Sequence, residues 1–87
     1  MPVPYDLDTF ICKDSYDIAL IAAGCVIHAV DNIGQGISKF AFCPIRPPGH
    51  HLGPYGAEMK FPSIDSTGFC ILNNVAIGAA YAKYNYK

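Results

Sequence analysis

The residues between Ser15 and Ile33 limit what this chain can fold into more than any other stretch. Ser15 is a residue type that caps helices, and the apolar residues after it recur at helical spacing: Ile18, Ile21, Ala22, Cys25, Val26, Ala29, Val30 and Ile33. This spacing predicts one long amphipathic helix over residues 15–33, ending at Gly34 and Gly36. Gly24 in its interior costs about 1 kcal/mol relative to alanine, so we expect another element to approach the helix closely there.

A helix this apolar needs partners to cover it, and the chain offers few. Of its 87 residues, 52% are hydrophobic and 15% are charged, which is too apolar for a disordered segment. A domain of this size buries only about 60% of its unfolded surface. Two explanations stay open: an unusually apolar miniprotein, or one part of a larger α/β protein whose other layers cover these faces. We favour the second and expect the isolated chain to be poorly soluble or to self-associate.

Charge and cysteine content exclude several classes of function. The formal net charge is −1 and the six Lys and Arg residues are scattered, so the chain lacks the basic patch that direct nucleic-acid binding or an anionic membrane requires. The first ten residues hold acidic side chains and no long apolar run, so we expect neither a secretory signal nor a membrane span there, and an intracellular protein. The four cysteines form no C-x-x-C pair, which favours buried thiols over disulfides or a zinc knuckle: Cys12, Cys25, Cys43 and Cys70.

The remaining segments predict an α/β order of elements. Residues 39–45, KFAFCPI, are typical of a strand covered on both faces, and Pro47 and Pro48 end it. Residues 46–67 form a long loop rich in Pro and Gly, and residues 68–72 form a second, short extended segment. Asn73 or Asn74 then caps a helix over residues 75–84. Loops that leave the carboxyl ends of parallel strands carry ligand sites, so we expect a crevice beside residues 46–51.

Two adjacent histidines, His50 and His51, lie in that loop. Adjacent imidazoles present four ring nitrogens that must be satisfied, so at least one ring is expected to face a cavity or a polar partner. One of them could exchange protons near neutral pH while the other stabilises charge. The alternative is a structural pair bonded to backbone carbonyls. A zinc site made from these two alone is disfavoured, because catalytic zinc usually takes three protein ligands.

Four stretches taken together resemble the histone deacetylase family in its class II-like branch, which includes acetylpolyamine amidohydrolases and acetoin-utilisation proteins. They are DLDTF at 6–10, YDIALIAAGCVIHAVDNI at 16–33, RPPGHH at 46–51 and GFCILNNVAIGAAYA at 68–82. The resemblance implies an arginase-like, three-layer α/β fold with a central parallel sheet. Residues 1–87 would form the N-terminal portion of that catalytic domain.

The resemblance also implies an activity and a site. The activity is zinc-dependent hydrolysis of the N-acetyl-lysine amide of histones or other proteins, in the nucleus and/or the cytoplasm. His51 would be the general base and acid, and His50 its electrostatic partner. Gly68 and Phe69 would line the channel for the lysine stem, supported by Cys70, Pro48 and Gly49. The resemblance places the zinc ligands, an Asp-x-His pair and a second Asp, outside these 87 residues, so this sequence supplies no metal ligand.

One departure from the family pattern keeps other functions open. The sixteen residues 52–67 form an insert after the histidine pair, which could lie at the channel rim and change substrate preference. The alternatives are a deacetylase of small acetylated amines, a catalytically inactive binding or assembly module that contacts co-regulator proteins, and an unrelated small domain.

Other residues have simpler expected roles. Arg46 serves either a salt bridge or the polar floor of the pocket. His28 is expected on the surface or packed, and not as a ligand. The tyrosines near the C-terminus are expected to pack with their hydroxyls in water.

Overall fold

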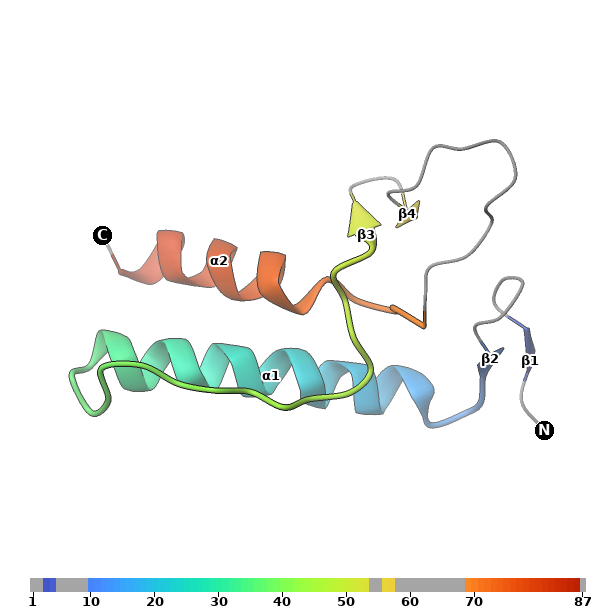
Figure 1. Ribbon diagram of the computed structural model, residues 1–87, viewed down its shortest axis with the longest axis horizontal. Helices are drawn as coiled ribbons and strands as arrows, with labels where there is room; N and C mark the ends of the chain where they lie inside the picture. Colours follow the sequence, from blue (N-terminus) through green and yellow to red (C-terminus); the bar gives the residue numbers. More distant parts are fainter. Residues whose placement is uncertain (1–2, 5–9, 54–55, 58–68, 87) are drawn as a thin grey trace.

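The structure is a computed structural model that describes residues 3–4, 10–53, 56–57 and 69–86. Two helices dominate it, and four two-residue strands lie at one end (Figure 1). In chain order the elements are β1 (Val3–Pro4), β2 (Phe10–Ile11), α1 (Ser15–Gly34), β3 (Leu52–Gly53), β4 (Gly56–Ala57) and α2 (Asn74–Asn85). Strand β1 pairs antiparallel with β2, and β3 pairs antiparallel with β4.

The two helices lie side by side and run in the same direction (Figure 1). Residue numbers rise together along the contact: Gly78 lies against Val26 and Val30, and the Tyr81 hydroxyl bonds Asp31. Parallel neighbours require a connection that travels back along them, and residues 37–46 provide it. The unit is therefore helix, extended return and helix, which is the order expected of one helical layer beside a sheet.

Both ends of α1 agree with the predicted range, but its first turn is built differently. Asp14 is the N-cap and makes no side-chain capping bond. Ser15 is instead the first helical residue, and its hydroxyl accepts the Cys12 amide at 2.9 Å. The predicted N-cap, Ser15, was therefore one residue late. At the other end, Gly36 has a φ of 79°, a left-handed conformation that glycine adopts without steric cost.

Much of the predicted apolar stripe of α1 lies uncovered among the described residues. The buried positions are the small ones, Ala19, Ala22 and Ala23, while Ile21 is 66% exposed and Ile18 is 51% exposed. By length and composition alone, α1 could also cross a membrane, a test that core helices of soluble proteins pass as well. Within the described part of the chain, α1 packs against α2, and its Asp31 accepts a hydrogen bond from Tyr81 of that helix.

The glycine at the close approach is Gly78 of α2, and the prediction for Gly24 was wrong. A Cβ placed on Gly78 would collide with the Val26 Cγ1 atom, whereas a Cβ on Gly24 meets nothing within 4 Å. Both glycines cost the same helix propensity, so propensity alone does not distinguish them. Only Gly78 allows the two helix axes to come together.

Residues 39–45 are extended but form no strand, contrary to the prediction. Phe40 and Phe42 are 84% and 87% exposed. Ala41, Cys43 and Ile45 line a cavity of about 330 Å³ with Val26 and Val75, but they also share a cavity of about 540 Å³ against α1 with Phe42. Consecutive side chains thus border one cavity, so the segment has neither the alternation of a strand nor its ladder. A ladder needs a neighbouring strand, and the described residues place none beside this segment.

Three hydrogen bonds meet at one carboxylate between the helices. The Tyr81 hydroxyl lies 2.9 Å from Asp31 Oδ1 and 3.1 Å from Oδ2, and the Tyr86 hydroxyl lies 2.8 Å from Oδ1. These hydrogen bonds are the main cause that raises the pKa of both tyrosines, because ionisation would leave a phenolate facing a carboxylate. The expectation of hydroxyls in water was wrong for Tyr81 and Tyr86.

The four cysteines, all within the described residues, remain as thiols. Only Cys70 is buried; Cys43 is half-buried, and Cys12 and Cys25 are exposed. The expectation of thiols was therefore confirmed, and that of general burial was wrong. Hydrogen bonds from the Ser15 side chain and the Asp14 backbone lower the pKa of the Cys12 thiol.

We expect Gly78→Val to lower the free energy of unfolding by about 1–3 kcal/mol, because the new side chain would force the helices apart at Val26. Gly24→Val is the matched control, since it also places valine at a glycine inside a helix. Its effect is expected to stay within about 0.5 kcal/mol. Urea unfolding followed by circular dichroism measures both, and equal losses for the two variants would contradict the packing.

We expect the contact between α1 and α2 to weaken at alkaline pH. Since the pKa values of Tyr81 and Tyr86 are raised in the folded state, their stabilisation is complete below the ordinary tyrosine pKa near 10. It is lost as pH rises through the raised values. Helicity measured from pH 8 to 12 should fall in the native chain, and Tyr81→Phe with Tyr86→Phe should remove this step. Tyr84→Phe, at a tyrosine that is 85% exposed, should leave it in place.

Candidate functional site

The histidine pair lies on a tight turn that follows the two prolines. His50 and His51 form the turn, and the Leu52 amide donates to the Gly49 carbonyl at 3.3 Å to close it. The two imidazole rings lie next to each other, with centroids 4.2 Å apart and planes tilted by 47°. His50 is exposed and His51 is half-buried. One ring is thus open to solvent while the other is partly enclosed by the protein.

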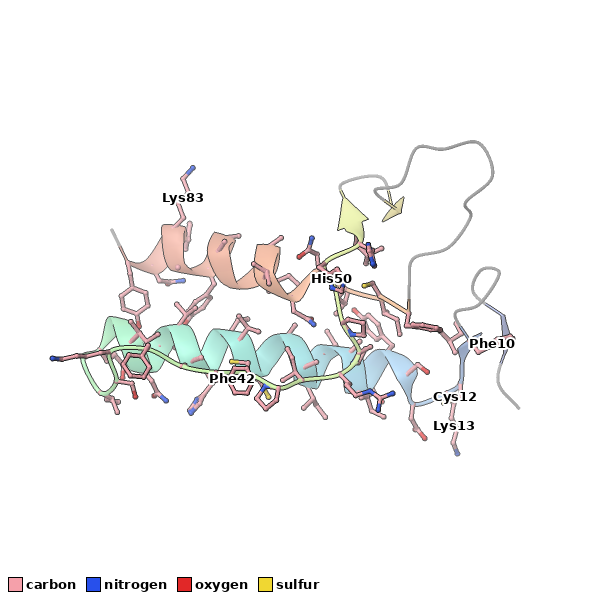
Figure 2. All side chains as sticks on the ribbon, in the orientation of Figure 1. Phe10, Cys12, Lys13, Phe42, His50 and Lys83 are labelled. Atoms are coloured by element: carbon pink, nitrogen blue, oxygen red, sulfur yellow. The ribbon has the colours of Figure 1, made fainter. Side chains whose placement is uncertain are left out.

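This turn rests on the first turn of α2, near which Figure 2 places His50. The Asn74 side-chain amide donates to the Pro47 carbonyl at 3.0 Å, and the Asn73 side-chain amide donates to the Leu52 carbonyl at 2.6 Å. Gly49 lies between these two bonds and is buried. A Cβ on Gly49 would collide with the Leu72 carbonyl oxygen and lie 2.6 Å from the Asn74 nitrogen. Glycine is required here because the two backbones touch.

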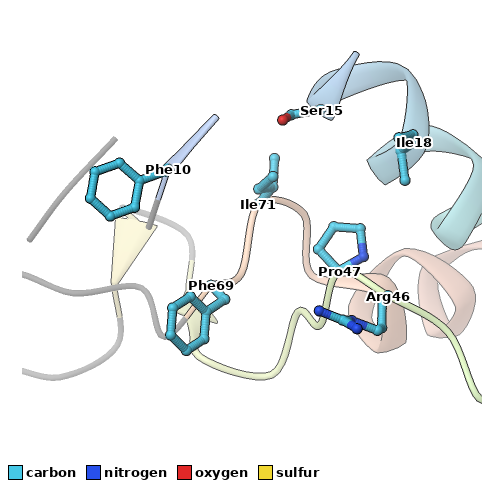
Figure 3. Close-up of a pocket in the computed structure, with 7 residues that line it drawn as sticks. All are labelled: Phe10, Ser15, Ile18, Arg46, Pro47, Phe69 and Ile71. Carbon is cyan, nitrogen blue, oxygen red and sulfur yellow. The ribbon is translucent and has the colours of Figure 1, made fainter. Parts of the chain in front are cut away.

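Phe69 opens the segment that leads into α2, and its backbone is left-handed, with a φ of 70°. Its ring is 57% exposed and points into a cavity of about 390 Å³, which Arg46, Pro47 and Ile71 also line (Figure 3). The predicted extended segment at 68–72 is therefore turned and not a strand over its described part. Gly68 lies outside the described residues.

The other predicted site residues are placed as supports of the loop. Cys70, the next residue after Phe69, is fully buried, and Pro48, the residue before Gly49, is half-buried. Pro48, Gly49, His50 and Asn74 line the cavity of about 330 Å³. Phe69 and Arg46 line the cavity of about 390 Å³ instead, so His50 and Phe69 lie on different cavities, and His51 is among the lining residues of neither. Arg46 is exposed at the edge of its cavity, and the choice between a salt bridge and the polar floor of the pocket stays a prediction.

The described residues do not form a metal centre. No group of three or more His, Cys, Asp or Glu side chains in this part of the chain could hold a metal ion. The two imidazoles alone fall short of the three protein ligands that catalytic zinc usually takes. His28 is exposed on α1, which confirms the expectation of a surface histidine.

Sequence reasoning missed what the two asparagines do besides capping. Asn73 is the N-cap of α2, as one of the two predicted alternatives had it, and its Oδ1 accepts the Ala76 amide at 3.0 Å. The side-chain amide of the same residue also reaches the histidine loop. A signal was present, since a cap needs one asparagine and the sequence has two in a row.

A model of the histone deacetylase domain matches residues 3–87. The chain belongs to the histone deacetylase family. This confirms the resemblance carried by the RPPGHH and GFCILNN motifs. The family implies an arginase-like α/β fold, and the pair of parallel helices with an extended return between them is compatible with one part of it.

Three relatives illustrate the range of this histone deacetylase family. Type-2 histone deacetylase 2 of Dictyostelium discoideum is 51% identical over 86% of this chain and 4% of its own length. Polyamine deacetylase HDAC10 of Danio rerio is 37% identical over 91% of this chain and 10% of its own. A probable deacetylase of Archaeoglobus fulgidus is 45% identical over 83% of this chain and 18% of its own. The chain thus spans less than a fifth of each of these relatives.

Proposed function

We propose that the complete protein hydrolyses the N-acetyl-lysine amide of histones or other proteins, releasing acetate and the free lysine. The observation that carries the proposal is the paired histidine turn of a histone deacetylase family chain, with one ring half-buried and the other exposed. An acid–base role needs an imidazole that is held in place and still reaches the substrate. His51 meets the first condition through its partial burial, and its position on a surface turn meets the second.

In this proposal His51 moves one proton in each half of the reaction. It accepts a proton from the attacking water as the bond from oxygen to the acetyl carbon forms. It then donates that proton to the amine nitrogen as the carbon–nitrogen bond breaks, so the imidazole ends as it began. His50, whose ring centroid lies 4.2 Å from that of His51, contributes an adjacent dipole near the developing charge.

Phe69 has a proposed role in holding the substrate. A lysine stem is a chain of four methylenes, which favours a flat apolar wall over a polar one. The Phe69 ring is 57% exposed and faces a cavity, so it offers such a wall. Gly68 beside it is proposed to leave room for the stem, by the family resemblance alone.

Zinc dependence is part of the proposal, with the ligands supplied by residues outside these 87. The described residues do not fit a zinc site, so no step above is assigned to the metal. We also propose, from the same resemblance, that the protein acts in the nucleus and/or the cytoplasm.

A second substrate class follows from one relative. The relative from Danio rerio is named as a polyamine deacetylase, so small acetylated amines are the competing substrates. They share the N-acetyl amide and the methylene stem with acetyl-lysine but lack the flanking peptide. Comparing kcat/KM on an acetyl-lysine peptide and on an acetylated polyamine decides between the two classes.

We expect His51→Ala in the complete protein to lower kcat on an acetyl-lysine peptide by about 10²–10⁴-fold, the usual contribution of a general acid–base group. His28→Ala is the matched control, because His28 is exposed on α1, and it should leave kcat unchanged. Removal of metal by a chelator should abolish turnover, and added zinc should restore it.

Two results would overturn the proposed function. An active His51→Ala variant would remove the acid–base assignment. A native protein with zinc bound and no turnover on either substrate class would favour the alternative of a catalytically inactive binding module.

A further inference from the structure

We infer that Asn73 and Asn74 are positioning residues that fix the His50–His51 turn by clamping the backbone on both sides of it. This inference rests on the proposed function of the histidines, and it concerns which residues outside the loop make that function possible. The two bonds that carry it run from consecutive side chains of α2 to Pro47 and Leu52. Asparagine at a helix start needs no such bonds in order to cap.

The clamp on the N-terminal side is buried. Asn74 is 5% exposed, and its side-chain amide donates to the Pro47 carbonyl at 3.0 Å. A buried amide that loses its partner costs about 1–3 kcal/mol, so this bond fixes the side chain and the carbonyl together. Pro47 lies three residues before His50, and the intervening Pro48 has little backbone freedom.

The clamp on the C-terminal side uses both ends of one amide. Asn73 Oδ1 accepts the Ala76 amide at 3.0 Å, which caps α2, while Nδ2 donates to the Leu52 carbonyl at 2.6 Å. Serine or aspartate would accept the first bond equally well. Making both bonds at once takes an acceptor and a donor on two separate arms of the side chain, which the amide has and the single, shorter hydroxyl of serine or the carboxylate of aspartate lacks, so the choice of asparagine is explained by the loop and not by the helix.

Gly49 packs against the start of α2 between the two hydrogen bonds that form the clamp. Its backbone touches that of α2, with a Cβ position only 2.8 Å from the Asn73 Cα and 2.6 Å from the Asn74 nitrogen. The chain from Pro47 to Leu52 is therefore bonded at both ends and pressed against the helix between them. His50 and His51 lie between the two bonded residues, so the position of their turn follows the position of α2.

The consequence for the reaction is pre-organisation. A catalytic group displaced by about 1 Å can lose 10²-fold in rate, because the reacting atoms must meet in one geometry. Releasing the Leu52 end of the loop should therefore lower kcat much more than it raises KM, since Leu52 is not among the residues that line the Phe69 cavity.

The test is Asn73→Ser in the complete protein, because the serine hydroxyl keeps the cap while the second arm of the side chain, which donates to Leu52, is gone. We expect kcat on an acetyl-lysine peptide to fall about 10- to 100-fold, with KM changed less than about 2-fold and an unchanged melting temperature. Asn85→Ala is the control. Its side-chain amide also donates to a backbone carbonyl, that of Tyr81 at 2.9 Å, at the far end of α2, and kcat should not change.

A second readout does not depend on activity. Hydrogen–deuterium exchange of the peptide covering residues 49–53, followed by mass spectrometry, should become about 2- to 10-fold faster in Asn73→Ser, the effect expected for one lost hydrogen bond. Asn74→Ala should accelerate exchange in the same peptide, and Asn85→Ala should not.

The outcomes separate this inference from the proposed function. If the native protein is active and Asn73→Ser matches it in both kcat and exchange, the clamp is overturned while the proposed function stands. If the native protein is inactive on both substrate classes, the proposed function fails, and the exchange measurement still decides whether the asparagines hold the loop.

Discussion

α1 and α2 lie parallel and close because Gly78 presents no side chain where Val26 needs room. Asp31 completes the contact by receiving the hydroxyls of Tyr81 and Tyr86. The remaining features of the molecule depend on this contact. It fixes where α2 begins, and the start of α2 is where the histidine loop is attached. A displacement of α2 along α1 would carry Asn73, Asn74 and both histidines with it.

The candidate site is therefore a loop whose shape is set by residues elsewhere in the chain, at the start of α2. Pro47 and Pro48 restrict the backbone locally, but the bonds that hold the turn come from a helix more than twenty residues further along the chain. This arrangement suits a group that must stay near the surface to meet substrate and still keep one orientation. Both the loop and the start of α2 depend on Gly49, because any larger residue at this position would separate them.

Sequence reasoning recovered what local chemistry determines. Both helices, a cap at Asn73 or Asn74 and the loop position of the histidines follow from periodicity, capping preference and proline. It failed where the outcome depends on distant partners. Residues 39–45 have the nearly continuous apolar run of a covered strand, but a strand also needs a neighbour to pair with. Gly24 and Gly78 are both interior helix glycines, and only packing distinguishes them. The bonds from Asn73 and Asn74 join residues 21 and 27 positions apart, which no local pattern encodes.

Phe40 and Phe42 are largely exposed in an extended segment that forms no strand among the described residues. Phe42 also borders a cavity of about 540 Å³ with Ile21 and His28 of α1. In an arginase-like α/β fold, which the family implies, a sheet would cover apolar side chains of this kind. The most direct test of the account is an experimental structure of the complete protein with a bound N-acetyl-lysine peptide. The account predicts the acetyl amide within hydrogen-bonding distance of His51, the stem against Phe69, and both asparagine bonds intact. A peptide bound on another face, with the histidine turn detached from α2, would contradict it.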